Sequence, residues 1–283
     1  MRVQLVFAAI VFNRILQRDV EESLILESKY GNIHKLYFID NSLREWRFAR
    51  KHFVFPSQTH IETARKSYLN EIRITQKLDH SNIIQAWPEA FDDGKIDIEY
   101  IMELGDVDSL ELVGNLYQQG KDPRKLVTRL IVQMLNAVEY MQSMNVSHLD
   151  IEPDNIVYFE HGQQFKLIDF GFAVEFRLHV QVCNAETEQY IVPKVSCLLD
   201  RHALYNAFKA DIYSLGITFW TLYVYPYSGG IKVCFNPDED TARYDPNGIH
   251  DLFNKMTHCR PENRRSIAEL KRHPWVVNAA NYL

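Results

Sequence analysis

The residues whose types and spacing could do chemistry gather between positions 148 and 171. The stretch from His148 to Asn155 reads HLDIEPDN, and Asp169-Phe170-Gly171 follows fourteen residues later. Asp150 can accept or orient the proton of an attacking hydroxyl group. Asn155 and Asp169 offer oxygen ligands of the kind that Mg²⁺ prefers. These groups suit phosphoryl transfer, because its catalysis rests mainly on positioning and on the neutralisation of charge.

Each of these residues taken alone has an ordinary structural explanation. Asp-Phe-Gly is often only a turn, and a histidine such as His148 is more often packed than catalytic. The combination and its order in the chain make the prediction specific. The loop also follows directly after residues 125–144, whose apolar positions predict a long buried amphipathic helix.

The elements that must position this loop fall into two groups along the chain. Alternating, aromatic and β-branched residues predict five strands, at residues 24–26, 33–39, 46–55, 84–91 and 96–103. The first two strands form a hairpin with its turn at Gly31, and a helical stripe over residues 62–78 separates the third strand from the fourth. After Leu104, helices are predicted at residues 125–144, 211–223 and 262–273, the last ending at Pro274.

This order predicts an α+β protein with two lobes. Residues 1–104 form a strand-rich N-terminal lobe with one main helix, and residues 105–283 form a larger, mostly helical lobe. Residues 1–20 are an N-terminal extension, and their apolar run Val3–Phe12 is about half the length of a membrane span. No small-residue cleavage site follows the run, so we expect an extra helix or strand on the first lobe, with a secretory signal as the alternative.

Composition limits the classes of partner and the compartment. The net charge of −6 argues against a nucleic-acid-binding surface, which usually needs a basic excess. The four cysteines lie far apart without a CxxC pair, which favours scattered thiols of an intracellular protein over a zinc site or a disulfide scaffold. We therefore expect a protein of the cytoplasm or nucleus without a nucleic-acid partner. We also expect a monomer without a membrane partner.

In place and order these motifs resemble the catalytic and metal loops of eukaryotic-type protein kinases, over about residues 20 to 278. The resemblance implies that Lys51 binds the nucleotide phosphates and that Glu71 pairs with this lysine. It also implies that Asp150 is the catalytic base, and that Asn155 and Asp169 hold the Mg²⁺ that accompanies ATP.

The same resemblance assigns the nucleotide contacts. The segment Tyr100–Gly105 is similar to the kinase hinge, where the Glu103 carbonyl and the Gly105 amide would contact adenine and Met102 would line the back of the pocket. The three glycines of the family's phosphate loop fall on Leu26, Ser28 and Gly31, so only the last is present. Nucleotide binding should be weaker, or the loop stiffer, because glycine allows close approach of the backbone to phosphates.

Two further motifs support the resemblance in the second lobe. Asp211–Gly216 matches the family's central helix, in which the aspartate holds the backbone of the catalytic loop. Arg264-Arg265-Ser266 and His273-Pro274-Trp275 are similar to the closing motif of serine/threonine kinases, and Thr187 aligns with a threonine of those members.

Three residues depart from the family pattern. Leu149 replaces the arginine that gathers the phosphate of a modified activation loop, which argues against control by such a phosphorylation. Glu152 replaces a lysine that neutralises the moving phosphoryl group, so we expect a basic residue beside the acceptor in the substrate to supply that charge. Lys194 replaces the glutamate that pairs with the arginine matched by Arg264, so this part of the lobe must be anchored differently.

The leading hypothesis is a serine/threonine protein kinase that uses ATP and Mg²⁺ on protein substrates, with a preference for basic ones. The alternatives are a pseudokinase that acts as a binding scaffold, and a small-molecule phosphotransferase of the aminoglycoside or choline kinase type. So many departures in a compact chain suggest a divergent branch of the family, of the kind that a large DNA virus encodes for use in its host cell.

Overall fold

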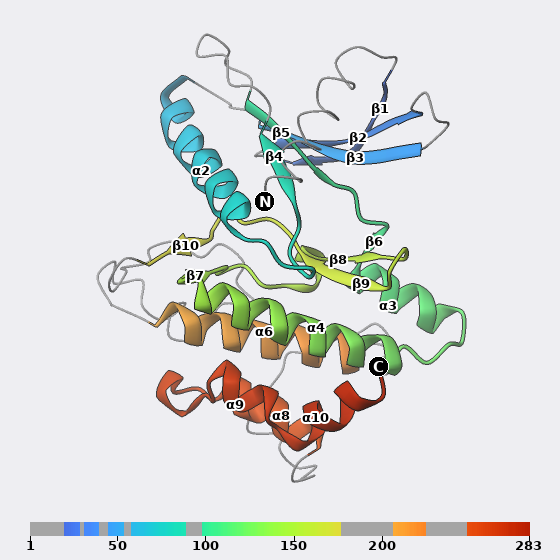
Figure 1. Ribbon diagram of the computed structural model, residues 1–283, viewed down its shortest axis with the longest axis vertical. Helices are drawn as coiled ribbons and strands as arrows, with labels where there is room; N and C mark the ends of the chain where they lie inside the picture. The colour runs from blue at the N-terminus through green and yellow to red at the C-terminus, as the bar shows by residue number, and fades with distance from the viewer. Residues whose placement is uncertain are drawn as a thin grey trace. The chain divides into compact units, whose positions relative to one another are not determined.

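The computed structural model describes residues 20–28, 31–39, 45–53, 58–88, 98–176, 206–224 and 248–283. The chain divides into two compact units after Leu104, except that Leu78–Ile83 belongs to the second unit rather than to the first. Figure 1 shows the strand-rich sheet of the first unit and the helices that dominate the second. This is the α+β arrangement of two lobes that the sequence predicts.

The first unit is built on one antiparallel sheet with the strand order β1-β2-β3-β5-β4. Its strands are β1 (Glu21–Ser28), β2 (Gly31–Ile39), β3 (Glu45–Phe53), β4 (Ala86–Pro88) and β5 (Ile98–Glu103). The main helix is α2 (Gln58–Lys77), close to the predicted span. The predicted hairpin of the first two strands is confirmed, and Gly31 pairs with Ser28 as the first residue of β2, directly after the turn.

Aromatic side chains form the core on one face of this sheet. Phe38, Trp46 and Phe48 stack with ring centroids 6.2–6.3 Å apart, and Trp87 meets Phe48 edge-on. Side chains alternate between the faces of a strand, so the odd-numbered positions of β3 lie on the opposite face. That opposite face carries Lys51.

The second unit combines short strands with helices that are mostly longer. The strands are β6 (Val107–Asp108), β7 (Val146–Ser147), β8 (Ile156–Phe159), β9 (Gln164–Leu167) and β10 (Val174–Glu175). The α-helices are α3 (Ser109–Gln118), α4 (Arg124–Ser143), α6 (Ala207–Val224), α8 (Ile249–Thr257), α9 (Ile267–Lys271) and α10 (Pro274–Asn281), and two 3₁₀ turns are η1 (Pro153–Asn155) and η3 (Pro261–Asn263).

Helices α4 and α6 lie side by side and support the loop that follows β7 (Figure 1). The apolar stripe predicted for α4 is buried, including Leu130, Met134 and Val138. Helix α6 is buried on nearly all sides, which explains why its sequence lacks an amphipathic pattern. At Gly216 a Cβ would lie 2.7 Å from Thr257, so the glycine permits the close approach of α6 and α8.

The prediction of one helix over residues 262–273 is wrong. Ser266 and Glu269 form a capping box that starts α9 after η3, because each side chain accepts a hydrogen bond from the other residue's backbone N–H. Pro274 starts α10 instead of ending a helix, since proline lacks the N–H that is unpaired at a first helical position. Helices α3 and α8 have no counterpart among the helices that the sequence predicts.

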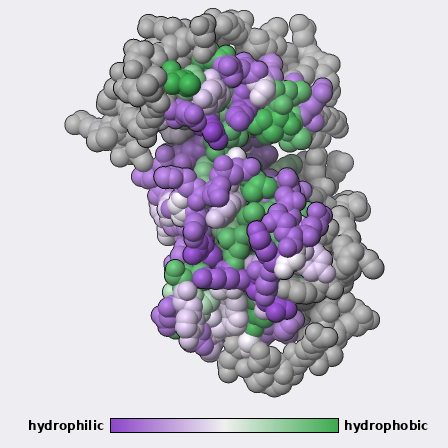
Figure 2. Space-filling model, turned by 90° about the vertical axis from the view of Figure 1, so that its right-hand side faces the viewer, coloured by the Kyte–Doolittle hydropathy of each residue, from purple (hydrophilic) through white to green (hydrophobic). Residues whose placement is uncertain are grey.

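Hydrophilic residues predominate on the described surface in Figure 2, and hydrophobic residues form small patches among them. None of the helices in the described ranges has the length and apolar composition needed to cross a membrane. The apolar run Val3–Phe12 lies outside the described residues.

Candidate active site

The loop after β7 is held by a buried carboxylate on α6. The backbone amides of His148 and Leu149 each donate a 2.8 Å hydrogen bond to Asp211, one to each oxygen. Leu149 has φ = 66°, a left-handed conformation that costs a non-glycine residue about 1–2 kcal/mol. Burial raises the pKa of Asp211 to about 7, while the two amides oppose that shift. Asp211 therefore stabilises a backbone turn that leucine alone would not favour.

His148 has a structural role. Its Nδ1 accepts a hydrogen bond from the Asp150 amide at 3.3 Å, so the proton resides on Nε2, which donates to the Ile168 carbonyl at 2.9 Å. The ring meets Phe170 edge-on at 4.7 Å between centroids. Burial lowers the pKa of His148, which keeps the imidazole neutral near pH 7. The histidine joins the Asp150 loop to the Asp169 loop.

Asp150 and Asn155 lie against each other in this loop. The Asn155 amide nitrogen donates to the Asp150 carbonyl at 2.9 Å and to the Asp150 carboxylate at 3.0 Å. Because its nitrogen end faces Asp150, the amide oxygen of Asn155 is the end left to face a ligand. The Asp150 carboxylate is thus held in one orientation while it remains partly exposed.

Asp169 is the second candidate oxygen ligand for a metal ion in the second unit, beside Asn155. It has φ = 58°, and its carboxylate accepts a hydrogen bond from the Gly171 amide at 3.2 Å. The Ile168 amide donates to the Asn155 carbonyl at 3.0 Å, which ties this segment to the loop that carries Asn155. An amide oxygen and a carboxylate are hard oxygen donors, so Asn155 and Asp169 fit Mg²⁺ in chemical type.

The first unit contains the predicted lysine–glutamate pair. Lys51 on β3 and Glu71 on α2 form an ion pair with 3.0 Å between Nζ and Oε1, and their side chains are only 14% and 3% exposed. The Tyr100 hydroxyl on β5 donates to the same Glu71 oxygen at 2.6 Å. The sequence predicts the ion pair, but it gives no signal for the tyrosine.

The predicted adenine contacts fall around the end of β5. Met102 is buried, and the Glu103 carboxylate accepts a hydrogen bond from the Gln85 amide at 2.9 Å. At Gly105 a Cβ would lie 1.9 Å from a methyl group of Val157, so packing against β8 already requires glycine there. The backbone contacts to adenine assigned to Glu103 and Gly105 stay predictions.

The predicted phosphate-loop positions lie on the first two strands. Leu26 is 54% exposed on the edge strand β1, where it can contact a ligand. Gly31 pairs with Ser28 at the hairpin end of β2. The roles of Leu26 and Gly31 in nucleotide binding also stay predictions.

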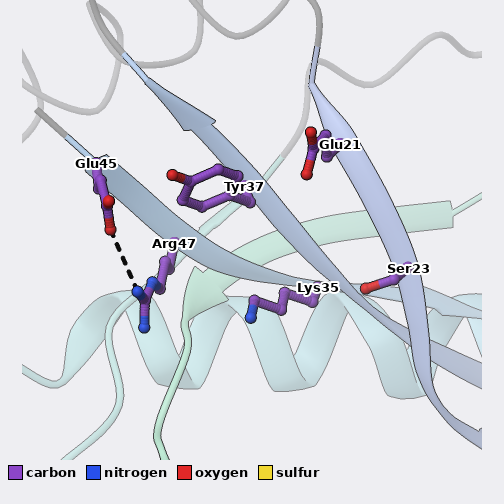
Figure 3. Close-up of a pocket in the computed structure, with 6 residues that line it drawn as sticks. All are labelled: Glu21, Ser23, Lys35, Tyr37, Glu45 and Arg47. Carbon is purple, nitrogen blue, oxygen red and sulfur yellow. Dashed lines mark hydrogen bonds and ion pairs between the residues drawn. The ribbon is translucent and has the colours of Figure 1, made fainter. Parts of the chain in front are cut away.

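A separate hollow of about 350 Å³ lies on strands β1, β2 and β3 (Figure 3). Its polar lining is Glu21, Ser23, Lys35, Tyr37, Glu45 and Arg47. Glu45 and Arg47 pair at 3.2 Å, which Figure 3 marks as a dashed line. Carboxylates and cations balance one another here, so the lining has the character of a solvated sheet face.

Arg264 is a buried cation anchored mainly by backbone oxygens. It is 2% exposed and donates to the carbonyls of His258 (2.7 Å), Lys209 (2.8 Å) and Cys259 (3.3 Å). Its guanidinium also lies 4.7 Å from the Tyr213 ring centre, and burial lowers its pKa to about 10. These contacts anchor Arg264, and the expectation of a different anchor in place of a glutamate at position 194 stays a prediction. Thr187 and Lys194 lie outside the described residues.

Comparison with known proteins agrees with this geometry. Residues 29–276 match the model of the protein kinase domain. An SNF-related serine/threonine-protein kinase of Rattus norvegicus is 26% identical over 277 residues, covering 87% of this chain and 35% of that protein. The Aurora kinase of Schizosaccharomyces pombe is 28% identical over 220 residues, covering 75% of this chain and 59% of that protein. The chain thus spans about a third to three fifths of the length of these relatives.

Proposed function

The chain belongs to the protein kinase domain family, and we propose that it is an active serine/threonine kinase that uses MgATP. The observation that carries this proposal is the braced Asp150, whose carboxylate is held at 3.0 Å by the Asn155 amide in a loop fixed by Asp211. A chain that kept only the fold as a scaffold would have no need of this orientation. The serine/threonine relatives support the choice of acceptor.

Each polar residue has a role in the proposed transfer. Asp150 orients the acceptor hydroxyl and takes its proton as the oxygen–phosphorus bond forms and the bond to the ADP oxygen breaks. Lys51, held by Glu71, neutralises charge on the nucleotide phosphates. Asn155 and Asp169 would hold magnesium, which supplies positive charge at the phosphates when it is bound. Met102, Glu103 and Gly105 would contact adenine.

We also propose that the protein substrate is basic near its acceptor. Glu152 lies two residues after Asp150 at the start of η1 and is half-buried. A carboxylate close to a transferring phosphoryl group is unfavourable unless a cation offsets it. An arginine or lysine beside the acceptor would provide that cation.

The test is Mg²⁺-dependent transfer of labelled phosphate from ATP to a basic protein and to a choline or aminoglycoside acceptor. Asp150→Asn should abolish transfer to the protein, whereas Asp154→Asn, an exposed carboxylate in the same loop, should retain it. Nucleotide binding without transfer would establish the pseudokinase instead. Transfer to the small acceptor alone would establish the small-molecule phosphotransferase.

A further inference from the structure

Tyr100 places a hydroxyl group against the buried end of the lysine–glutamate pair. Its side chain is 3% exposed, and the hydroxyl donates to Glu71 Oε1 at 2.6 Å. The same oxygen accepts a hydrogen bond from Lys51 Nζ at 3.0 Å. A hydroxyl–carboxylate distance near 2.6 Å is typical of a charge-assisted hydrogen bond. Two donors of different kinds thus converge on one carboxylate oxygen.

Neighbouring aromatic rings fix the position of the Tyr100 hydroxyl. The Tyr100 ring lies 5.9 Å from Tyr68 and 6.2 Å from Phe53 between centroids. Phe53 also meets Tyr68 edge-on at 5.1 Å and lies 5.2 Å from Lys51 Nζ. Tyr68 uses its own hydroxyl elsewhere, donating to the Glu99 carbonyl at 3.0 Å. The ring packing therefore leaves the Tyr100 hydroxyl directed at Glu71.

The burial of Glu71 makes this extra donor important. The residue is 2% exposed, and a buried carboxylate is costly unless donors compensate for its lost hydration. In the proposed reaction Lys51 also binds the nucleotide phosphates, so its ammonium group is shared between those phosphates and Glu71. The Tyr100 hydroxyl has no part in the proposed transfer, so its hydrogen bond to Glu71 does not compete with phosphate binding.

We propose that Tyr100 is a positioning residue that fixes the Glu71 carboxylate and, through it, the Lys51 ammonium group. The proposal deepens the kinase function proposed above and rests on it for its kinetic consequence. The placement of Lys51 itself is a property of the first unit and can be measured without any phosphotransfer.

The kinetic test compares Tyr100→Phe with Tyr68→Phe. Each variant removes one buried hydroxyl from the same aromatic group, but only the first removes a donor to Glu71. Tyr100→Phe should raise KM for ATP or lower kcat by roughly tenfold, the scale of a hydrogen bond to a charged group. Tyr68→Phe should leave both constants near the wild-type values. In a Glu71→Gln background, Tyr100→Phe should have little further effect.

The second readout is the rate at which an amine-reactive reagent labels Lys51 in the nucleotide-free protein, followed by mass spectrometry. Tyr100→Phe should increase this rate, and Tyr68→Phe should not. Equal labelling rates in wild type and Tyr100→Phe, or equal changes in both variants, would overturn the proposal. A wild-type protein that transfers no phosphate but shows the labelling difference would overturn the kinase function and leave the role of Tyr100 intact.

Discussion

Glu152 places a carboxylate where the protein kinase pattern has a lysine. The backbone carbonyl of Glu152 accepts a hydrogen bond from the backbone N–H of Asn155 at 3.1 Å. The Glu152 backbone therefore belongs to the turn that places Asn155. A side-chain replacement should preserve this backbone contact. The charge at position 152 can therefore be changed separately from the geometry of the loop.

Glu152→Lys should weaken the preference for basic substrates. A lysine there would supply the cation that we assign to the substrate, so a peptide with neutral residues beside its acceptor should gain in kcat/KM relative to a basic peptide. Asp154→Lys introduces the same change of charge at an exposed position in the same loop and is the matched control. An unchanged ratio of the two peptides in Glu152→Lys would refute the assignment.

Arg264 joins the end of α8 to the start of α6 in the second unit. Its guanidinium binds carbonyls at the end of α8, just after α8 and in the first turn of α6. The Lys209 ammonium group donates in return to the Arg264 carbonyl. Within the described residues, backbone oxygens and the Tyr213 ring thus hold the cation.

Arg264→Met should lower the free energy of unfolding by roughly 2–4 kcal/mol, because buried carbonyls would lose their donors. Arg265→Met is the control, since Arg265 is exposed and pairs with Glu269 on the surface of α9. The measurement is urea unfolding of both variants at pH 7. Equal, small losses in the two variants would show that the carbonyl contacts of Arg264 contribute little.

The sequence predicts some helices and contacts of the molecule but not others. Periodicity predicts α4 because its buried residues form one stripe, and the kinase motifs predict the pairing of Lys51 with Glu71. Periodicity does not predict that a new helix begins after Ser266, because the apolar pattern continues through the capping box that starts α9. The Tyr100 contact has no local signal, because 29 residues separate the hydroxyl from the carboxylate that it binds.

In the molecule as a whole, hydrogen bonds within each unit hold the polar residues of the candidate active site. In the first unit, Lys51, Glu71 and Tyr100 are already joined by hydrogen bonds. In the second unit, Asp211 binds the backbone amide of Leu149, the residue that stands where the protein kinase pattern has an arginine. A leucine side chain cannot bind phosphate. The hydrogen bonds that position Glu71 and the Leu149 loop thus come from other residues of the same unit.

Treatment with a broad-specificity phosphatase should consequently leave the activity unchanged. A kinase controlled through its activation loop loses activity when the phosphate is removed, because an arginine cluster no longer has its anionic partner. Here Leu149 offers no charge for such a phosphate, and Tyr100 already holds Glu71 in place. The measurement is kcat/KM for a basic peptide before and after treatment, with mass spectrometry to verify that phosphate is absent and a mock-treated sample as the control. A large loss of activity that MgATP preincubation restores would show that phosphorylation controls this chain after all.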